Sequence, residues 1–175
     1  MKKIMVILVV MAMFLFSFNV FAQAQSSWSV KAGLDFGSEL EVDGVDDFDT
    51  EMGYSLIGEY KMPYRENLNL GAGLAYQLDR EEETNNSDFG FTPFYGLAEY
   101  RMQDSPFYFL GHLGYASFRY DEADDTSGGL YYALGGGMDL GQSYEAEVLY
   151  TNNSGESDND DVDYSKFTVT FGMRF

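Results

Sequence analysis

The final eleven residues, 165–175, place the tightest constraint on how this chain can fold. Apolar side chains occupy every odd position of this segment and polar or small ones every even position, and the apolar set is Phe167, Val169, Phe171, Met173 and Phe175. Successive side chains of a β-strand point to opposite faces, so the segment predicts a strand with one apolar and one polar face. Taken alone, it fits either a half-buried strand of a soluble β-domain or a strand facing lipid.

The N-terminal segment has the three parts of a secretory signal peptide. Lys2 and Lys3 form a positive start, residues 4–18 are almost entirely apolar, and a small-x-small cleavage site follows at 22–24. A membrane-spanning helix is the alternative, although no later apolar run approaches the roughly 20 residues that such a helix needs. We expect residues 1–24 to be removed, by cleavage after Ala22 or Ala24, leaving one domain at 25–175.

Composition narrows the class further. The net charge of −19 becomes −21 once residues 1–24, with two lysines and no acid, are removed, and this excludes most nucleic-acid roles, which need a basic surface. The absence of cysteine excludes disulfides and thiolate metal sites. Aromatic residues make up 17% of the chain, with 19 glycines and 3 prolines, which favours an all-β fold.

Alternating patterns recur along the whole exported segment. They predict strands at 28–36, 53–61, 68–78, 89–101, 107–118, 130–140, 144–151 and 165–175, with Pro93 weakening the early part of the fourth. Short turns at 62–67, 102–106 and 141–143 alternate with long loops at 38–51, 80–88, 121–129 and 152–163. These four loops hold 20 of the 29 acidic residues. The pattern predicts an eight-stranded antiparallel up-and-down β-barrel with an acidic end.

The distribution of aromatic residues indicates which face of the barrel points outward. The apolar faces carry aromatic side chains at both strand ends, with aliphatic and small residues between them. One belt comprises Trp28, Tyr60, Tyr100, Phe107, Tyr144 and Phe175, and the other Phe36, Tyr54, Tyr76, Tyr115, Tyr132, Tyr150 and Phe167. Two such belts are typical of a transmembrane barrel. The alternative is a soluble lipocalin-like carrier, in which the apolar face would line a ligand pocket.

The opposite face is expected to consist of small residues and charges of both signs. A lumenal charge network is predicted from Lys31, Glu59, Lys61, Glu99, Arg101, Asp139, Glu145, Glu147 and Arg174. Because an unpaired buried charge is costly, Glu145 and Glu147 should lie near Arg174, and Glu59 and Glu99 near Lys61, Arg101 or Lys31. The network could be structural or could line a narrow ion path.

Few residues suggest chemistry. His112 is the one histidine, it lacks the nearby serine of a deacylase-like pair, and strand alternation directs it into the lumen. A lipid A-modifying enzyme remains an alternative, and no cofactor is indicated. Asp158, Asp160, Asp161 and Asp163 offer oxygen ligands for a divalent cation but lack the glycine and glutamate of an EF-hand loop, so a solvated loop competes with loose ion binding.

Together, the signal peptide, the eight strands, the aromatic belts and the terminal phenylalanine resemble the outer-membrane β-barrel domain family, the small OmpA/OmpX-type, porin-like barrels. The resemblance implies a Gram-negative outer-membrane location, with 167, 169, 171, 173 and 175 as the signal read by the barrel assembly machinery. It implies contact with lipid and lipopolysaccharide, and a non-enzymatic role in membrane integrity or in binding an extracellular ligand. A narrow channel is the alternative. No wall-binding domain follows the last strand, so anchoring to peptidoglycan is not expected.

Overall fold

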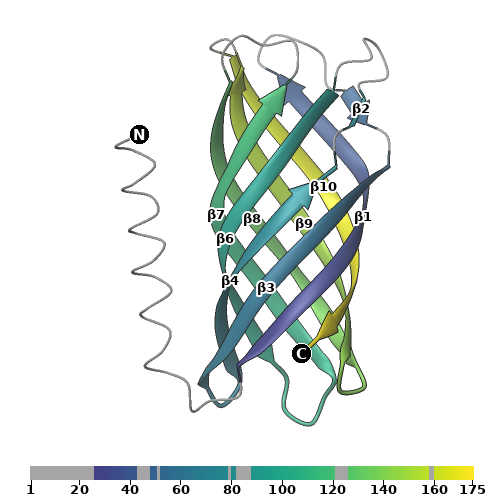
Figure 1. The fold of residues 1–175 in the computed structure, drawn as a ribbon, viewed down its shortest axis with the longest axis vertical. Helices are drawn as coiled ribbons and strands as arrows, with labels where there is room; N and C mark the ends of the chain where they lie inside the picture. Colours follow the sequence, from purple (N-terminus) through teal and green to yellow (C-terminus); the bar gives the residue numbers. More distant parts are fainter. Residues whose placement is uncertain are drawn as a thin grey trace.

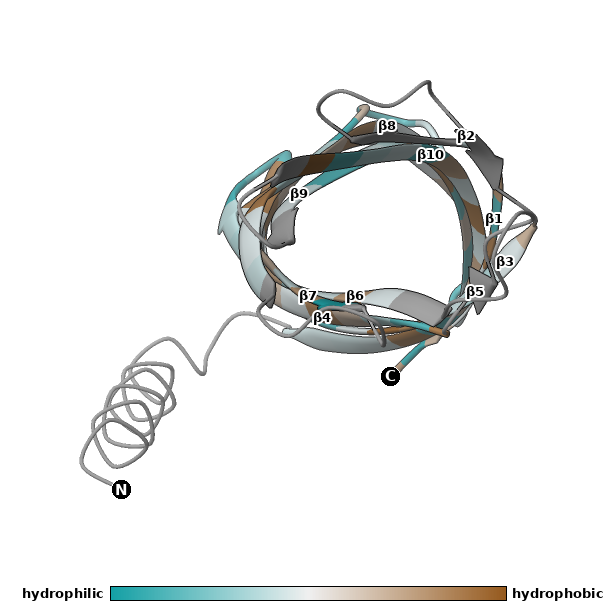
Figure 2. Cartoon of the chain, turned by 90° about the horizontal axis from the view of Figure 1, so that it is seen from above, coloured by the Kyte–Doolittle hydropathy of each residue, from teal (hydrophilic) through white to brown (hydrophobic). Residues whose placement is uncertain are grey.

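Eight long antiparallel strands close into a single barrel, which Figure 1 shows from the side and Figure 2 along its axis. The computed structural model describes residues 26–42, 48–50, 52–78, 80–81, 88–120, 126–157 and 160–175. The barrel strands are β1 (Ser27–Val42), β3 (Gly53–Arg65), β4 (Leu68–Gln77), β6 (Asp88–Arg101), β7 (Phe107–Tyr120), β8 (Thr126–Leu140), β9 (Tyr144–Ser157) and β10 (Asp160–Arg174). Two short strands, β2 (Phe48–Thr50) and β5 (Arg80–Glu81), extend the pairing at one end. The predicted eight-stranded fold is confirmed.

Each barrel strand pairs with its neighbours in sequence, and β10 returns to pair with β1. Main-chain hydrogen bonds from Trp28 N to Phe175 O (3.1 Å) and from Phe175 N to Trp28 O (2.8 Å) complete the closure. Both of these residues lie at the end that carries the short turns, here called the turn end; the opposite end is the loop end. The predicted signal peptide lies outside the described residues. Within them, no helix is long and apolar enough to cross a membrane.

The strands run further toward the loop end than the sequence pattern predicted. Strand β1 reaches Val42 instead of residue 36, and β9 and β10 take up most of the predicted loop 152–163. The predicted turn 62–67 was also too long, because β3 continues to Arg65. In β9 and β10 the outward side chains beyond the aromatic belt are polar while the main-chain pairing continues, so a pattern of outward apolar side chains underestimates these strands.

A bulge marks the point where β1 passes that belt. Phe36 pairs with Phe167, but Glu39 pairs with Ser165, so β1 gains one residue relative to β10. Gly37 lies at this shift with φ of +55°, a left-handed conformation that glycine adopts without a steric penalty.

The wall also has an interruption between β4 and β6, here called the seam. Pairing of β4 with β6 stops at Leu74 and Phe94, and β5 resumes it at Arg80 and Phe89 with the register shifted by one residue. Pro93 lies directly at the stop and lacks the N–H that a ladder requires. The predicted weak start of this strand is therefore local: β6 remains continuous and paired with β7 along its length.

The strand faces divide as the alternation predicted. Both aromatic belts are exposed or half-buried and point outward, as do the aliphatic residues between them, so the lipocalin-like arrangement is wrong. The prediction for the inner face was incomplete. Its loop-end half is largely aromatic, and the large side chains Phe91, Phe118, Tyr131 and Tyr164 are buried there.

Candidate functional site

The turn-end half of the lumen holds one connected set of charges, here called the charge layer. The structure places all nine residues of the predicted network in it, linked by nitrogen–oxygen distances of 4.0 Å or less: Lys31, Glu59, Lys61, Glu99, Arg101, Asp139, Glu145, Glu147 and Arg174. They come from β1, β3, β6, β8, β9 and β10. Because all these strands contribute, the layer connects the barrel wall across its interior.

Lys31 lies at the centre of three carboxylates. Its Nζ is 2.7 Å from Glu59 Oε2, 2.6 Å from Glu147 Oε1 and 3.4 Å from Glu145 Oε1. One oxygen from each of the three glutamates lies within 4.8 Å of the others, a spacing that could hold a metal ion. The ammonium group takes the place of such a cation: it donates hydrogen bonds to Glu59 and Glu147 and lies within ion-pair distance of Glu145. All four side chains are buried.

A second part of the charge layer faces the turn end. Lys61 Nζ is 2.9 Å from Glu99 Oε2, and Arg101 Nε is 2.6 Å from Glu99 Oε1. Asp139 bridges two guanidinium groups, at 2.5 Å from Arg101 Nη1 and 2.9 Å from Arg174 Nη1. Charge-assisted contacts of this length are the stronger class of hydrogen bond. The bridge is partly exposed, so it forms the rim of the layer.

Individual pairings differ in part from those expected from the sequence. Glu145 lies 3.8 Å from Arg174, at the edge of an ion pair. Glu147 bonds to Lys31 instead, and it also accepts hydrogen bonds from Tyr108 Oη (3.1 Å) and Thr170 Oγ1 (3.3 Å). The sequence shows which side chains share the lumen but not their depth, because the strands are staggered around a barrel.

Above the charge layer lies an aromatic layer that the sequence interpretation missed. The ring of Phe91 lies 4.7 Å from that of Phe118 and 5.7 Å from that of Tyr164, and Tyr95 lies 5.2 Å from Tyr131. A signal for these residues existed: Phe91 and Tyr95 share the alternation of Glu99 in β6, which the interpretation placed inside. The inner face was predicted from its small and charged residues alone, so the aromatic residues that share its alternation were overlooked.

His112 connects the two layers. It is buried in the lumen, as the alternation predicted, with its ring stacked at 4.4 Å and 12° on Tyr95. Its Nδ1 lies 3.4 Å from Tyr131 Oη, and its Nε2 lies 3.8 Å from Glu59 Oε1, which also accepts a hydrogen bond from Tyr95 Oη at 2.9 Å. Its surroundings are therefore aromatic rings and the charge layer.

A further ion pair lies nearer the loop end. Lys166 Nζ is 2.7 Å from Asp35 Oδ2, and Asp35 also accepts hydrogen bonds from Ser55 Oγ (2.7 Å) and Thr168 Oγ1 (2.6 Å). At the turn end, a cavity of about 740 Å³ is lined by Lys61, Asn69, Arg101 and Arg174 among others and ends at the charge layer. The lumen is thus open from the turn end as far as the charge layer, and the buried rings of the aromatic layer lie above that layer.

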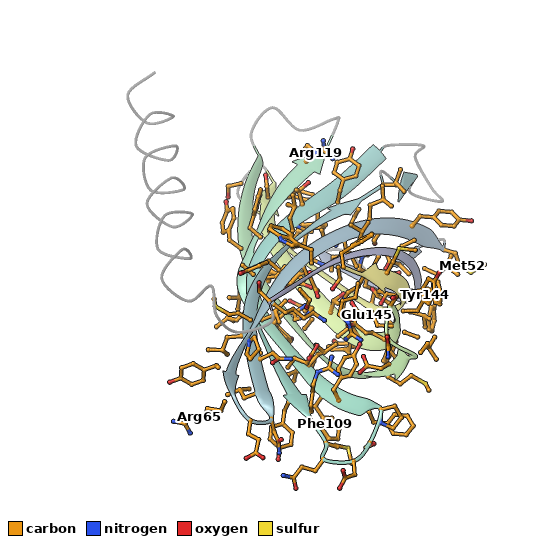
Figure 3. The ribbon with its side chains drawn as sticks, turned by 60° about the horizontal axis from the view of Figure 1, so that its bottom comes forward. Met52, Arg65, Phe109, Arg119, Tyr144 and Glu145 are labelled. Atoms are coloured by element: carbon orange, nitrogen blue, oxygen red, sulfur yellow. The ribbon has the colours of Figure 1, made fainter. Side chains whose placement is uncertain are left out.

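The remaining predicted residues lie elsewhere. The five apolar residues of the last strand point outward, and Figure 3 shows the same outward placement for Phe109 and Tyr144, whereas Glu145 lies inside the barrel. Of the four aspartates proposed as cation ligands, the side chain of Asp163 is described: it is exposed and accepts a hydrogen bond from Ser154 Oγ at 2.7 Å. The side chains of Asp158, Asp160 and Asp161 lie outside the description.

Comparison with known proteins agrees with this architecture. The model of the outer membrane protein beta-barrel domain family matches residues 8–175. Ail, the attachment invasion locus protein of Yersinia pestis, is 17% identical, with 86% of this chain and 98% of Ail aligned at a TM-score of 0.59. Neisserial surface protein A is 12% identical, with 85% and 97% aligned at 0.60. A structure of Ail in complex with the heparin analogue sucrose octasulfate aligns at 0.55, with 16% identity over 86% and 99%. No curated protein sequence matches the chain.

Proposed function

Because this chain belongs to the outer membrane protein β-barrel domain family, we propose that it is a non-enzymatic outer-membrane protein acting in surface binding or membrane integrity. Its location in a Gram-negative outer membrane follows from the family and the similar barrels. With the short turns in the periplasm, as is usual for such barrels, the loop end faces the outside of the cell.

One observation carries the proposal: buried charged and aromatic side chains occupy the lumen above the turn-end cavity. In the charge layer, Lys31 is held by carboxylates at 2.6–2.7 Å, and above it the rings of Phe91, Phe118 and Tyr164 pack against one another. An eight-stranded barrel has just enough interior for its own side chains. Contact with other molecules therefore falls to the loop end and to the lipid-facing surface.

The acidic loop end favours a cationic partner. The four predicted loops carry most of the chain's acidic residues, so a positively charged protein surface or a divalent cation is attracted, while a polyanion is repelled. Ail, a barrel of the same fold, has been observed with a heparin analogue, which is anionic. We expect this chain to prefer a cationic partner over a polyanion, because the loops rather than the barrel determine which partner binds.

The surroundings of His112 support the absence of catalysis. Its ring is stacked on Tyr95 and buried below the aromatic layer, where a lipid substrate in the membrane cannot reach it. Replacing His112 with Gln should leave the lipid A mass spectrum of the cells unchanged. An altered spectrum would assign an enzymatic role.

The channel alternative can be tested in planar bilayers. The charge layer and the aromatic layer oppose a continuous water path, so the purified protein should add no conductance above the protein-free baseline. Steps of conductance that change on substitution of Glu99 with Gln would restore the channel, because Glu99 bridges Lys61 and Arg101 within the layer.

The central experiment compares binding of the folded protein to immobilised polylysine and to immobilised heparin. The matched variant replaces the acidic residues of 38–51 and 152–163 with Asn or Gln and leaves the other residues of the barrel unchanged. We expect binding to polylysine, little binding to heparin, and loss of polylysine binding in the variant. Binding that survives neutralisation, while the variant still shifts in gel mobility on boiling, would remove the surface role and leave membrane integrity.

A further inference from the structure

A polar patch interrupts the outward apolar surface at the loop end. It comprises Tyr76 of β4, Thr92 of β6, and Ser117 and Arg119 of β7, and is here called the seam patch. Thr92 pairs directly with Ser117, and Gly90 pairs with Arg119, so these side chains share one area of the wall. The patch combines one guanidinium group with three hydroxyl groups.

Arg119 is distinctive among the cations of this acidic chain. The five side chains Lys31, Lys61, Arg101, Lys166 and Arg174 point into the lumen and pair with carboxylates there. Of the basic side chains that the structure describes, Arg119 alone points outward from the loop-end half of the wall, while Arg65 lies at the turn end (Figure 3).

The guanidinium group is held above an aromatic ring. Arg119 Cζ lies 5.3 Å from the centre of the Tyr76 ring, and between their strands β6 presents Gly90, which has no side chain to separate them. Arg119 lies four residues beyond Tyr115 of the aromatic belt on the same face of β7, about 10 Å further along the barrel axis. This is the depth at which lipid headgroups begin.

The seam lies beside this patch. Residues 75–77 of β4 and 90–93 of β6 make no ladder with each other, although all are described. Main-chain polar groups facing lipid need partners, since an open sheet edge is not tolerated within hydrocarbon. A polar headgroup seated over the seam could supply such partners.

We propose that the seam patch binds a phosphate group of an outer-leaflet glycolipid. Arginine suits this role because its planar donors match phosphate oxygens in a bidentate geometry, and the adjoining hydroxyl groups add donors. An arginine at the membrane boundary also gains from an anionic headgroup. The inference concerns the lipid-facing wall, so it stands apart from the proposed role of the loops.

The test measures lipid retained by the folded protein in native mass spectrometry. The probe is lipid A carrying both phosphates, presented in mixed detergent micelles. Arg119→Gln should retain roughly tenfold less lipid A than the parent, in line with the loss of a hydrogen bond to a charged group. Arg65→Gln is the matched control, because Arg65 also lies over a tyrosine ring, at 5.5 Å from Tyr64, but at the turn end. Arg119→Lys, which keeps the charge, should retain an intermediate amount.

Four outcomes would overturn the proposal. Equal retention by the parent and Arg119→Gln would show that Arg119 does not bind the lipid. Equal losses in Arg65→Gln would indicate a general effect of charge. Retention of dephosphorylated lipid A at the parent level, or displacement of lipid A by excess inorganic phosphate, would show that acyl chains or free phosphate are the ligand instead. Each variant is first checked for the gel shift on boiling, so that only folded protein is compared.

Discussion

Replacing Lys31 with Met should destabilise the barrel more than any other single change in the charge layer. The substitution keeps most of the side-chain volume but removes the ammonium group that lies 2.6–2.7 Å from Glu59 and Glu147 and 3.4 Å from Glu145. Three carboxylates with oxygens within 4.8 Å of one another would then face each other without that cation.

The expected loss of stability follows from the charges that remain in the charge layer after the substitution. Breaking a buried ion pair by removing one partner costs about 3–5 kcal/mol, mainly because the other charge stays buried and uncompensated. The charge layer holds five carboxylates and four cations, so loss of Lys31 leaves five against three. Lys61, 3.4 Å from Glu59 and 3.5 Å from Glu145, already serves Glu99 and can compensate only in part. We expect a loss at the upper end of that range at neutral pH.

The assay is reversible urea unfolding of the barrel in lipid vesicles, followed by tryptophan fluorescence and by gel mobility. Lys166→Met is the matched control, because it removes an equally short ion pair at 2.7 Å but leaves Asp35 with two hydroxyl donors. Its cost should be smaller. Adding Glu147→Gln to Lys31→Met should recover part of the loss, because it removes one of the three crowded charges.

The pH dependence provides a second readout. The destabilisation by Lys31→Met should shrink as the pH falls, because protonation of Glu59 or Glu147 relieves the repulsion between these two carboxylates once the cation is gone. Equal unfolding midpoints for Lys31→Met and the parent at neutral pH would refute the reasoning. A double variant that is no more stable than Lys31→Met would also refute it, because the carboxylates would then not repel one another when Lys31 is absent.

Two further predictions concern packing and assembly. Gly73→Ala should destabilise by about 1–3 kcal/mol in the same assay, because an added Cβ would lie 2.5 Å from the Tyr95 ring, whereas Gly58→Ala should be neutral, because nothing lies within 4 Å of its added Cβ. Phe175→Ala keeps the terminal main-chain hydrogen bonds and should lower the amount of folded barrel in the outer membrane, measured by the shift in gel mobility on boiling. Phe107→Ala, in the same aromatic belt, is the control and should not lower it. Equal amounts of the two variants would contradict an assembly signal at Phe175.

The fold could be predicted from the sequence because, in a membrane barrel, the alternation of apolar and polar residues follows the alternation of lipid-facing and lumen-facing positions. A strand such as 165–175 has lipid on one side and packed side chains on the other, so every second residue reports its surroundings. The same coupling explains the errors in strand length. Beyond the belt the outward side chains become polar, as at Asp163 and Ser165 of β10, so the outward apolar signal ends there although the pairing of β10 with β1 continues.

The depth of each lumenal side chain, and which aromatic residues face the lumen, were harder to predict. Lys31 and Glu147 are 116 residues apart, and their contact depends on the stagger accumulated over the intervening strands. The aromatic layer was missed because the inner face was predicted from its small and charged residues alone, although the register of Tyr95 and Phe91 places both inside. Counting alternate positions from Glu99 would have placed both correctly.

The position of Lys31 also bears on how the protein enters the membrane. It lies in the first strand, and one of its two closest partners, Glu147, lies in the last strand but one, so its charge is fully matched only when nearly the whole chain has arrived. A partly inserted open sheet would carry an unmatched ammonium group into a medium of low dielectric constant, which costs several kcal/mol. A chain that ended before β9 would lack both Glu145 and Glu147, and Lys31 would keep only Glu59 of its three carboxylates. The charge of the first strand is therefore compensated in full only in a nearly complete barrel.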